Sequence, residues 1–255
     1  MQLLIEAGNT FVKLARYWSD RPMEYVGKYP NKQLELVLEP ILTEVIERIV
    51  FASVGPVEIE NAIQRIASQA NIAVMQVKTP KQDFGVSNAY QEYQYLGIDR
   101  WLTLVAMHQK SAQNRIIIDI GTALTFDVLC ASGQHLGGWI TPGYQLMMDS
   151  VLNNTAKVFS HDKQTDCIQF ANNTADGLNH GCRAALLGLI ELGIRQAQEQ
   201  WHYPPQVILC GGGVQHLPKS FVEKHQCCFD LVLDGLSLYA DGEKCSKKHR
   251  LIGVT

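Results

Sequence analysis

The sequence has few of the features that mark a membrane, secreted or nucleic-acid-binding protein. Its longest apolar run, Ala184 to Ile190, is far shorter than the roughly 20 residues needed to span a bilayer, so we expect no membrane partner. The first expected strand begins almost at Met1, and we therefore expect no signal peptide. A net charge of −3 and a pI near 6.2 indicate that nucleic acid is not a partner either.

Cysteine occurs without any CxxC pair. The seven cysteines are an odd number, which is typical of a reduced compartment and predicts a cytoplasmic protein. His225, Cys227 and Cys228 lie close together in the sequence. No second ligand pair at a suitable spacing accompanies them, so a zinc site is not expected.

Two common nucleotide-binding signatures are missing. The chain has neither a Walker A motif, GxxxxGK[ST], nor the set of motifs that marks protein kinases. An enzyme with this sequence that transfers a phosphoryl group must therefore use an ATP site of another design. The length of 255 residues and a hydrophobic content of 46% suffice for one large domain or two smaller ones.

The most informative stretch is residues 116–129, IIIDIGTALTFDVL. Its branched apolar residues favour two buried strands, and Gly121 favours a tight turn between them. Asp119 falls at the end of the first strand. A carboxylate beside backbone N–H groups and a hydroxyl can hold a hydrated cation next to a phosphate.

The same pattern recurs at the N-terminus. Residues 3–10 align with residues 116–123 at one fixed offset, so that Glu6 matches Asp119 and Gly8 matches Gly121. This repeat predicts two related domains, 1–112 and 113–255, which each open with an acid-tipped hairpin and together clamp a nucleoside triphosphate. The alternative is a pair of ordinary buried hairpins with glycine turns.

Hydrophobic periodicity predicts an α/β order for the rest of the chain. Asp99 falls near the start of a helix expected over about 102–108, where a helix cap is an alternative to a functional role. Gly211 to Gly213 follow a strand and suit either close approach of backbone to a nucleotide or a flexible turn. The expected strands are 12–17, 48–54, 72–77, 138–140 and 207–210. The other expected helices are 34–48, which is interrupted at Pro40, 58–70, 143–153 and 182–201, and the expected polar loops are 78–94 and 172–177.

Five segments in this order resemble the type III pantothenate kinases, within the acetate/sugar kinase–Hsp70–actin superfamily. The resemblance spans nearly the whole chain and implies two actin-like (ribonuclease H-like) α/β domains with a central cleft. The segments are EAGNT with Lys13, LGIDRW at 96–101, DIGTA at 119–123, GGWI with Pro142 and Gly143, and the Thr174 loop with Gly211 and Gly212.

The resemblance implies phosphorylation of pantothenate by ATP, the first step of coenzyme A biosynthesis. It implies that Asp99 is the proton acceptor and that Asp119 binds a monovalent cation, potassium or ammonium, beside the Mg²⁺ that accompanies ATP. It also implies a homodimer. The implied ATP ligands are Glu6, Ala7, Gly8, Asn9, Thr10, Phe11, Val12, Lys13 and Thr122, and the implied pantothenate ligands are Tyr90, Gly97, Ile98, Asp99, Arg100 and Thr174.

The residue chemistry agrees with these roles but leaves alternatives open. Arg100 offers planar donors for a carboxylate or phosphate, with a salt bridge on the helix surface as the alternative. Tyr90 has a polar tip that can reach an amide, yet it also reads as an ordinary loop aromatic, and Trp101 reads as core. The first loop of the family that this sequence resembles normally carries aspartate where this chain has Glu6, whose extra methylene moves the carboxylate outward by roughly 1.5 Å.

Two further hypotheses remain at this point. The first is a relative that kept the fold and became a regulatory or accessory protein, for which Glu6 is the one supporting residue. The second is a kinase of the same superfamily that acts on a sugar.

Overall fold

The computed structural model describes residues 1–42, 45–159, 168–201 and 203–250, with residues 243–250 as backbone only. The chain forms two compact units. The first contains Met1–Phe84, Tyr90–Lys110 and the chain from Leu231 on, and the second contains Gly85–Ala89 and Ser111–Asp230.

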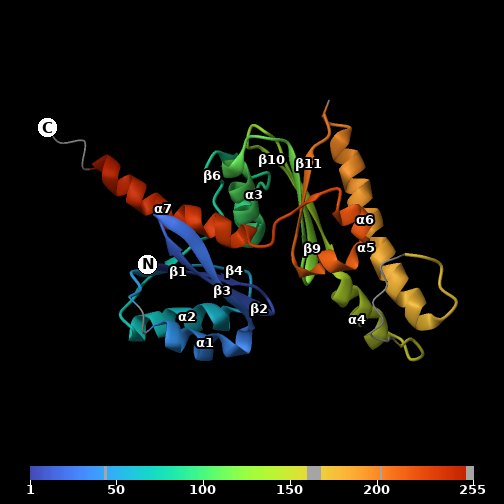
Figure 1. Cartoon of the computed structure of the whole chain (residues 1–255), viewed down its shortest axis with the longest axis horizontal. Coiled ribbons are helices and arrows are strands. Elements are labelled where there is room, and N and C mark those ends of the chain that lie inside the picture. Colours follow the sequence, from blue (N-terminus) through green and yellow to red (C-terminus); the bar gives the residue numbers. More distant parts are fainter. Residues whose placement is uncertain (43–44, 160–167, 202, 251–255) are drawn as a thin grey trace. The chain divides into compact units, whose positions relative to one another are not determined.

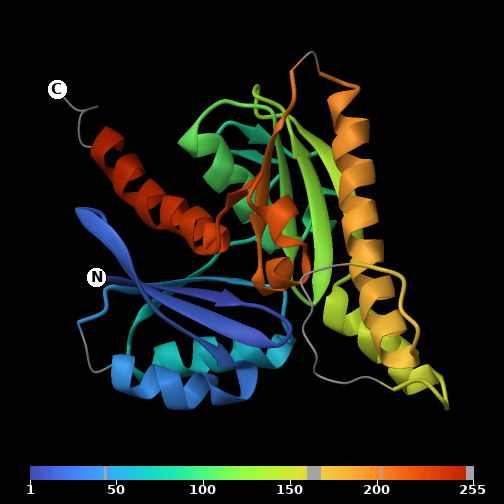
Figure 2. The ribbon, with the colours of Figure 1, turned by 45° about the vertical axis from the view of Figure 1, so that its right-hand side comes forward.

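The first unit is built on a five-stranded sheet in the order β3-β2-β1-β4-β5. Figures 1 and 2 show α1 and α2 together on one face of this sheet, while α3 and α7 contact strands from the other. The elements are β1 (Gln2–Ala7), β2 (Phe11–Trp18), β3 (Arg21–Pro30), η1 (Asn31–Gln33), α1 (Leu34–Ile41), β4 (Arg48–Ser53), α2 (Val57–Gln69), β5 (Ala73–Gln76), β6 (Gln82–Asp83), η2 (Tyr93–Tyr95), α3 (Ile98–Lys110) and α7 (Leu231–Arg250).

Alternation along β1 sets the two faces of this sheet. Leu3 and Ile5 pack with α1 and α2 in one apolar cluster and are fully buried. Gln2 lies on the opposite face, where its amide donates to the Ala240 carbonyl of α7 at 3.1 Å. Glu6 follows the alternation of Gln2, so its side chain leaves the sheet on the face that α3 and α7 cover.

The second unit repeats the arrangement, with strand order β10-β9-β8-β11-β12. Helices α4 and α5 pack on β8 and β9 through a second apolar cluster that includes Ile118 and Leu186. The elements are β7 (Val86–Ser87), β8 (Arg115–Ile120), β9 (Ala123–Leu129), β10 (His135–Pro142), α4 (Tyr144–Asn154), α5 (Thr174–Gln198), β11 (Gln206–Cys210), η3 (Gly212–His216), α6 (Lys219–Val222) and β12 (Gln226–Cys227).

Both sheets have the same connectivity, which confirms the prediction of two related α/β domains. In each, the first strand pairs antiparallel with the second and parallel with the fourth. The hairpin turns differ by one residue, because Ala7 pairs with Val12 in the first unit and Ile120 pairs with Leu124 in the second.

Three predictions about elements need correction. Strand β3 was not expected, because it is an edge strand with no buried residue and lacks a clear alternation. The polar loop predicted over 172–177 is largely helix, since α5 begins at Thr174 and the Asn173 side chain accepts from the Asp176 N–H as its cap. Helix α7 joins the first unit by its contacts, whereas the sequence-based division placed its residues in the second domain.

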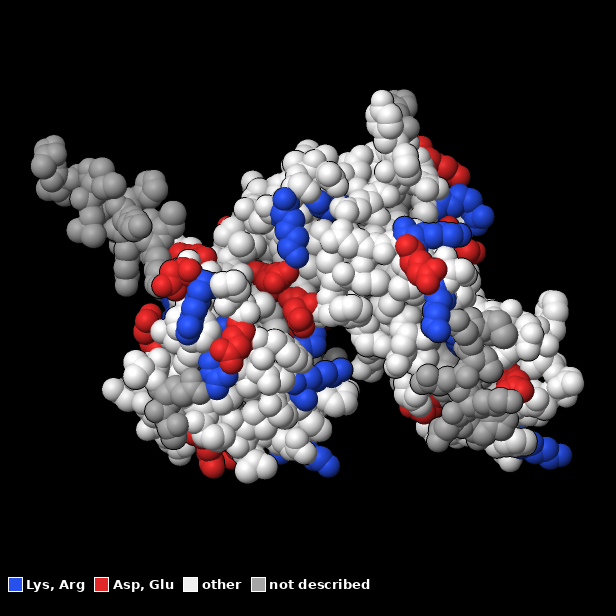
Figure 3. Space-filling model, viewed as in Figure 1, with Lys and Arg blue, Asp and Glu red and all other residues white. Residues whose placement is uncertain are grey.

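The surface shows no extended basic patch among the described residues on the face drawn in Figure 3. There, acidic and basic side chains are interspersed. Of the helices that the structure describes, none is both long and apolar enough to cross a membrane.

Helix α7 crosses α3 at a point where only glycine fits, and this contact predicts a stability effect. A Cβ on Gly235 would lie 2.4 Å from the Leu102 carbonyl oxygen. We expect Gly235→Ala to lower the free energy of unfolding by about 1–3 kcal/mol, because helix backbone must move to admit the methyl group. Urea unfolding measures this change.

Gly188→Ala is the matched control, because a Cβ there meets nothing within 4 Å. It should leave the protein as stable or stabilise it by up to about 1 kcal/mol, since alanine is the better helix former. A Gly235→Ala protein as stable as Gly188→Ala would contradict the close crossing.

Candidate active site

The acid of the first hairpin is paired with a lysine across the sheet. Glu6 and Lys13 lie directly opposite each other in register on β1 and β2. Lys13 Nζ lies 3.0 Å from Glu6 Oε2, and both side chains are about one-fifth exposed. Solvent ions screen such a partly buried pair less than a surface pair. The attraction between the two charges therefore keeps the Lys13 ammonium beside Glu6 at this end of the sheet.

The turn that follows Glu6 is held by a residue that the sequence analysis did not identify. Asn31 Nδ2 donates to the carbonyl oxygens of Gly8 and Asn9, each at 3.0 Å, and its own N–H donates to Thr10 O at 3.1 Å. The side chains of Ala7 and Val12 are buried, so only the backbone of these two residues is open to a ligand. Asn9, Thr10 and Phe11 are exposed. No sequence signal links Asn31 to the turn, because only the return of β3 brings it there.

Asp99 lies in the first turn of α3 and partly fulfils the expected role of a cap. Its Oδ1 accepts from the Arg100 N–H at 2.8 Å. A Cβ on Gly97 would lie 2.5 Å from Asp99 Oδ1, so the carboxylate folds back over the glycine. The positive end of the helix dipole favours the charged form of a carboxylate in this place.

Arg100 is buried, so its alternative reading as a surface salt bridge is wrong. Its side chain is 4% exposed, and its Nη1 donates to the Tyr90 hydroxyl at 3.0 Å. Trp101 is fully buried, as predicted, and its Nε1 donates to Tyr239 OH at 2.9 Å. The structure thus brings Tyr90, Gly97, Ile98, Asp99 and Arg100 together at the start of α3.

In the second unit, the triple glycine packs closely around the end of β8. A Cβ on Gly211, which has φ +84°, would lie 2.4 Å from both Asp119 Oδ1 and Ile120 O. Gly213 would meet Ile120 O at 2.8 Å. The backbone of Gly211–Gly213 therefore packs closely against the end of β8 and is not a flexible turn. It lies against the Asp119 carboxylate and the Ile120 carbonyl oxygen.

These oxygen donors suit a hard cation, which prefers carboxylate and carbonyl ligands. Within the described part of the chain, no three His, Cys, Asp or Glu side chains gather into a ligand cluster, so carbonyl oxygens or waters would have to complete the shell. Glycine at position 211 lets the backbone lie against the Asp119 carboxylate and the Ile120 carbonyl oxygen, which a side chain there would displace.

Thr122 lies in the hairpin turn of the second unit, against the start of α4. The Gly143 N–H donates to Thr122 O at 2.9 Å. A Cβ on Gly143 would lie 2.2 Å from Gly121 O and 2.9 Å from Thr122 O. The side chain of Thr122 is exposed, while its backbone is fixed by this contact.

A buried polar cluster holds the end of η3, the short helix that contains Gly212 and Gly213. Arg183 is 4% exposed, and its Nε donates to the carbonyl of His216, the last residue of η3, at 2.7 Å. The His216 ring stacks on Tyr144 of α4 with centroids 3.9 Å apart. Burial, and then the charge of Arg183, lower the pKa of His216, which favours the neutral form of the ring in this stack.

Thr174 is the first residue of α5 and is exposed. Close to it, a largely apolar groove of about 440 Å³ lies between α4 and α5 and is lined by Met147, Val151, Leu178 and Cys182 among others.

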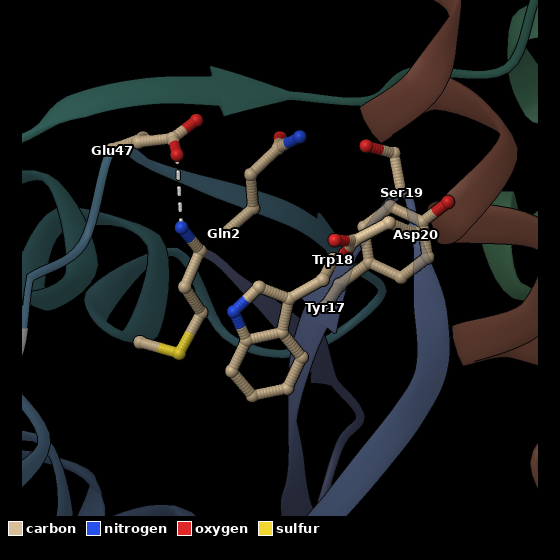
Figure 4. Close-up of a pocket in the computed structure, with 7 residues that line it drawn as sticks. Gln2, Tyr17, Trp18, Ser19, Asp20 and Glu47 are labelled. Carbon is tan, nitrogen blue, oxygen red and sulfur yellow. Dashed lines mark hydrogen bonds and ion pairs between the residues drawn. The ribbon is translucent and has the colours of Figure 1, made fainter.

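A second pocket, of about 270 Å³, lies in the first unit, at the ends of β1 and β2 that are far from their hairpin turn (Figure 4). It is lined by Met1, Gln2, Tyr17, Trp18, Ser19, Asp20 and Glu47, and none of these is a predicted site residue.

The duplicated sheet and its hairpins define an actin-like fold of the kind found in sugar kinases. A Campylobacter jejuni protein described as a conserved putative Baf family transcriptional activator superposes with a TM-score of 0.61 at 19% identity, covering 96% of this chain and 99% of that one. A putative 2-dehydro-3-deoxygalactonokinase from Sinorhizobium meliloti gives 0.57 at 13% identity, covering 95% and 96%. At these identities the likeness establishes the fold alone.

Sequence relatives narrow the assignment. Residues 2–196 match the family model described as type III pantothenate kinase. Proteins with that name from Idiomarina loihiensis and Pseudoalteromonas translucida are 35% and 34% identical, covering 94% and 97% of this chain and 98% and 100% of the relatives. The chain therefore belongs to the type III pantothenate kinase family.

The contact between Gly143 and the hairpin turn predicts an effect on ATP. Gly143→Ala should raise the KM for ATP about tenfold or more, which corresponds to ~1.4 kcal/mol, because the methyl group displaces the Gly121–Thr122 backbone. The KM for the phosphoryl acceptor should change less. Steady-state kinetics with each substrate varied measures both.

Gly177→Ala is the matched control in the same unit, since a Cβ there meets nothing within 4 Å. Its KM for ATP should equal that of the wild type. An unchanged KM for ATP in Gly143→Ala would show that the turn does not contact the nucleotide.

Proposed function

We propose that this chain transfers the γ-phosphoryl group of ATP to the primary hydroxyl of pantothenate and so forms 4'-phosphopantothenate, the first step of coenzyme A biosynthesis. The observation that carries this proposal is the family match over residues 2–196, together with Asp99 and Arg100 side by side at the start of α3. The regulatory alternative draws no support from Glu6, whose carboxylate is held in an ion pair with Lys13.

Asp99 orients the acceptor hydroxyl in this proposal. The hydroxyl oxygen forms a bond to the γ-phosphorus while the bond from that phosphorus to the ADP oxygen breaks. A carboxylate with an unperturbed pKa near 4 is a weak base, so Asp99 takes the hydroxyl proton late, after the new bond has largely formed. The Arg100 N–H, 2.8 Å from Oδ1, fixes the carboxylate for this role.

Arg100 and Tyr90 form a donor pair for the substrate. A buried guanidinium retains most of its attraction for an anion, because water does not screen it. Its bond to the Tyr90 hydroxyl, at 3.0 Å, holds both groups in one orientation. We assign them to the carboxylate and amide of pantothenate, with Thr174 contributing a hydroxyl.

The hairpin turn of the first unit binds the ATP phosphates in this proposal. Backbone N–H groups of residues 9–11 and the Lys13 ammonium are the donors, and Thr122 is a further ATP ligand. Oriented donors of this kind stabilise the charge that is spread over the phosphoryl oxygens in the transition state.

Two kinds of cation complete the site. Kinases of this family use ATP with a divalent metal, which neutralises phosphate charge. In this proposal Glu6, near the end of β1, is the acid assigned to the side of that metal. We assign potassium or ammonium to Asp119 and the Ile120 carbonyl. We further propose a homodimeric, cytoplasmic enzyme, for which light scattering should give twice the 28.5 kDa chain mass.

A coupled assay tests the proposed function. With Mg²⁺ and K⁺ present, ADP should form only when pantothenate is added, and mass spectrometry should find pantothenate carrying one added phosphoryl group. A panel of hexoses serves as the competing set of acceptors. Turnover of a hexose with pantothenate unchanged would replace the proposal by a sugar kinase, and no turnover of any acceptor would overturn it.

The role of Asp99 predicts the effect of one substitution. Asp99→Asn should lower kcat at least about 100-fold, because the amide cannot accept the proton. Circular dichroism and the thermal midpoint should stay close to those of the wild type. Asp234→Asn is the matched control, since Asp234 pairs with Lys110 on the surface and should not affect kcat. A kcat within a few-fold of wild type in Asp99→Asn would remove the proton-acceptor role.

A further inference from the structure

An aspartate and a histidine are buried as a pair in the second unit, and neither is among the residues assigned to the chemistry. Asp127 of β9 is 1% exposed and His135 of β10 is fully buried. His135 Nε2 lies 2.9 Å from Asp127 Oδ1. Because burying such groups costs free energy unless hydrogen bonds compensate it, the contacts of the pair indicate what it does.

A β-bulge brings His135 into this position. The register of β10 on β9 shifts between His135 and Gly137, so that Leu136 is the extra residue, and Gly137 has φ +101°. Leu136 is 42% exposed while His135 is fully buried. Bulges commonly re-aim a side chain next to a functional site.

The other ring nitrogen of His135 holds the backbone of a distant segment. The Ala89 N–H donates to His135 Nδ1 at 3.4 Å. Since Nδ1 accepts, Nε2 carries the proton and donates to Asp127. Asp127 thereby selects the tautomer that can accept the Ala89 N–H.

Ala89 ends a short segment that is anchored along its length to the start of β10. Val86 is fully buried, the Ser87 N–H donates to Gly133 O at 3.0 Å, and Ser87 forms a parallel bridge with Gln134. The next residue in the chain is Tyr90, which accepts from Arg100. The His135 bond is thus the last anchor before the residues assigned to pantothenate.

We propose that Asp127 and His135 are positioning residues that fix the 86–90 segment and thereby set the affinity for pantothenate. This inference rests on the proposed function, in which Tyr90 contacts that substrate. Without the anchor, the backbone that leads to Tyr90 samples more conformations although the Tyr90 hydroxyl still meets Arg100, and substrate binding has to order that backbone. The KM for pantothenate then rises, while kcat changes little because Asp99 and Arg100 are held by α3.

Two substitutions of His135 separate this role from a purely structural one. In His135→Gln the terminal amide stands near the place of Nε2, so it keeps a donor for Asp127 and loses the acceptor for Ala89. In His135→Asn the side-chain oxygen stands near the place of Nδ1, so it keeps the acceptor and leaves Asp127 without its donor.

We expect opposite results from the two variants. His135→Gln should keep a thermal midpoint near that of the wild type and raise the KM for pantothenate about tenfold, with kcat and the KM for ATP within about threefold. His135→Asn should lower the midpoint and keep the KM for pantothenate near the wild-type value. If both variants lose stability and raise the KM for pantothenate equally, the positioning role is overturned.

Hydrogen exchange at the Ala89 amide gives a readout that does not require activity. Exchange should be about tenfold faster in His135→Gln than in the wild type and unchanged in His135→Asn. Unchanged exchange in His135→Gln would overturn the anchor. If the wild type itself fails to phosphorylate pantothenate, the proposed function and the effect on affinity fall, and the exchange measurement alone decides whether the anchor exists.

Discussion

Close packing of glycine backbone against the hairpin turns is the constraint on which the candidate site depends. Gly55 lies against the Gly8 carbonyl, Gly143 against that of Gly121, and Gly211 against Asp119 and Ile120, each with less than 2.6 Å for an added Cβ. A turn held in this way has little freedom, so its N–H groups and the acid before it keep fixed directions. Preorganised dipoles of this kind need no rearrangement when a phosphate binds.

In the proposed function the same hairpin serves two different electrostatic purposes. In the first unit the acid faces Lys13 in register, and the resulting ion pair fixes a positive charge near the turn. In the second unit Asp119 faces Thr125, and its carboxylate lies beside a carbonyl oxygen. In the proposed function these two oxygens hold the monovalent cation, since hard cations prefer carboxylate and carbonyl ligands. The side chain of Glu6 suits the first purpose, because it reaches across to Lys13.

Local patterns were enough to predict the repeated hairpin, since an apolar run, an acid and a glycine turn all lie within a few residues. They also placed Asp99 near a helix start and Trp101 in the core. The features that they missed depend on contacts between distant parts of the chain. Asn31 reaches the first turn only through β3, and His135 meets Ala89 only through a bulge. The early start of α5 is a different case, because the Asn173 cap was a readable signal that the polar composition of the segment obscured.

A potassium titration of activity in Glu6→Gln and Asp119→Asn, measured beside the wild type, tests this division between the two hairpins most directly. Glu6→Gln should keep its activation by potassium and need more ATP for half-maximal rate, because Lys13 loses its partner. Asp119→Asn should lose the activation by potassium over sodium. Retained activation in Asp119→Asn, or its loss in Glu6→Gln, would contradict the assignment of the cation to the second unit.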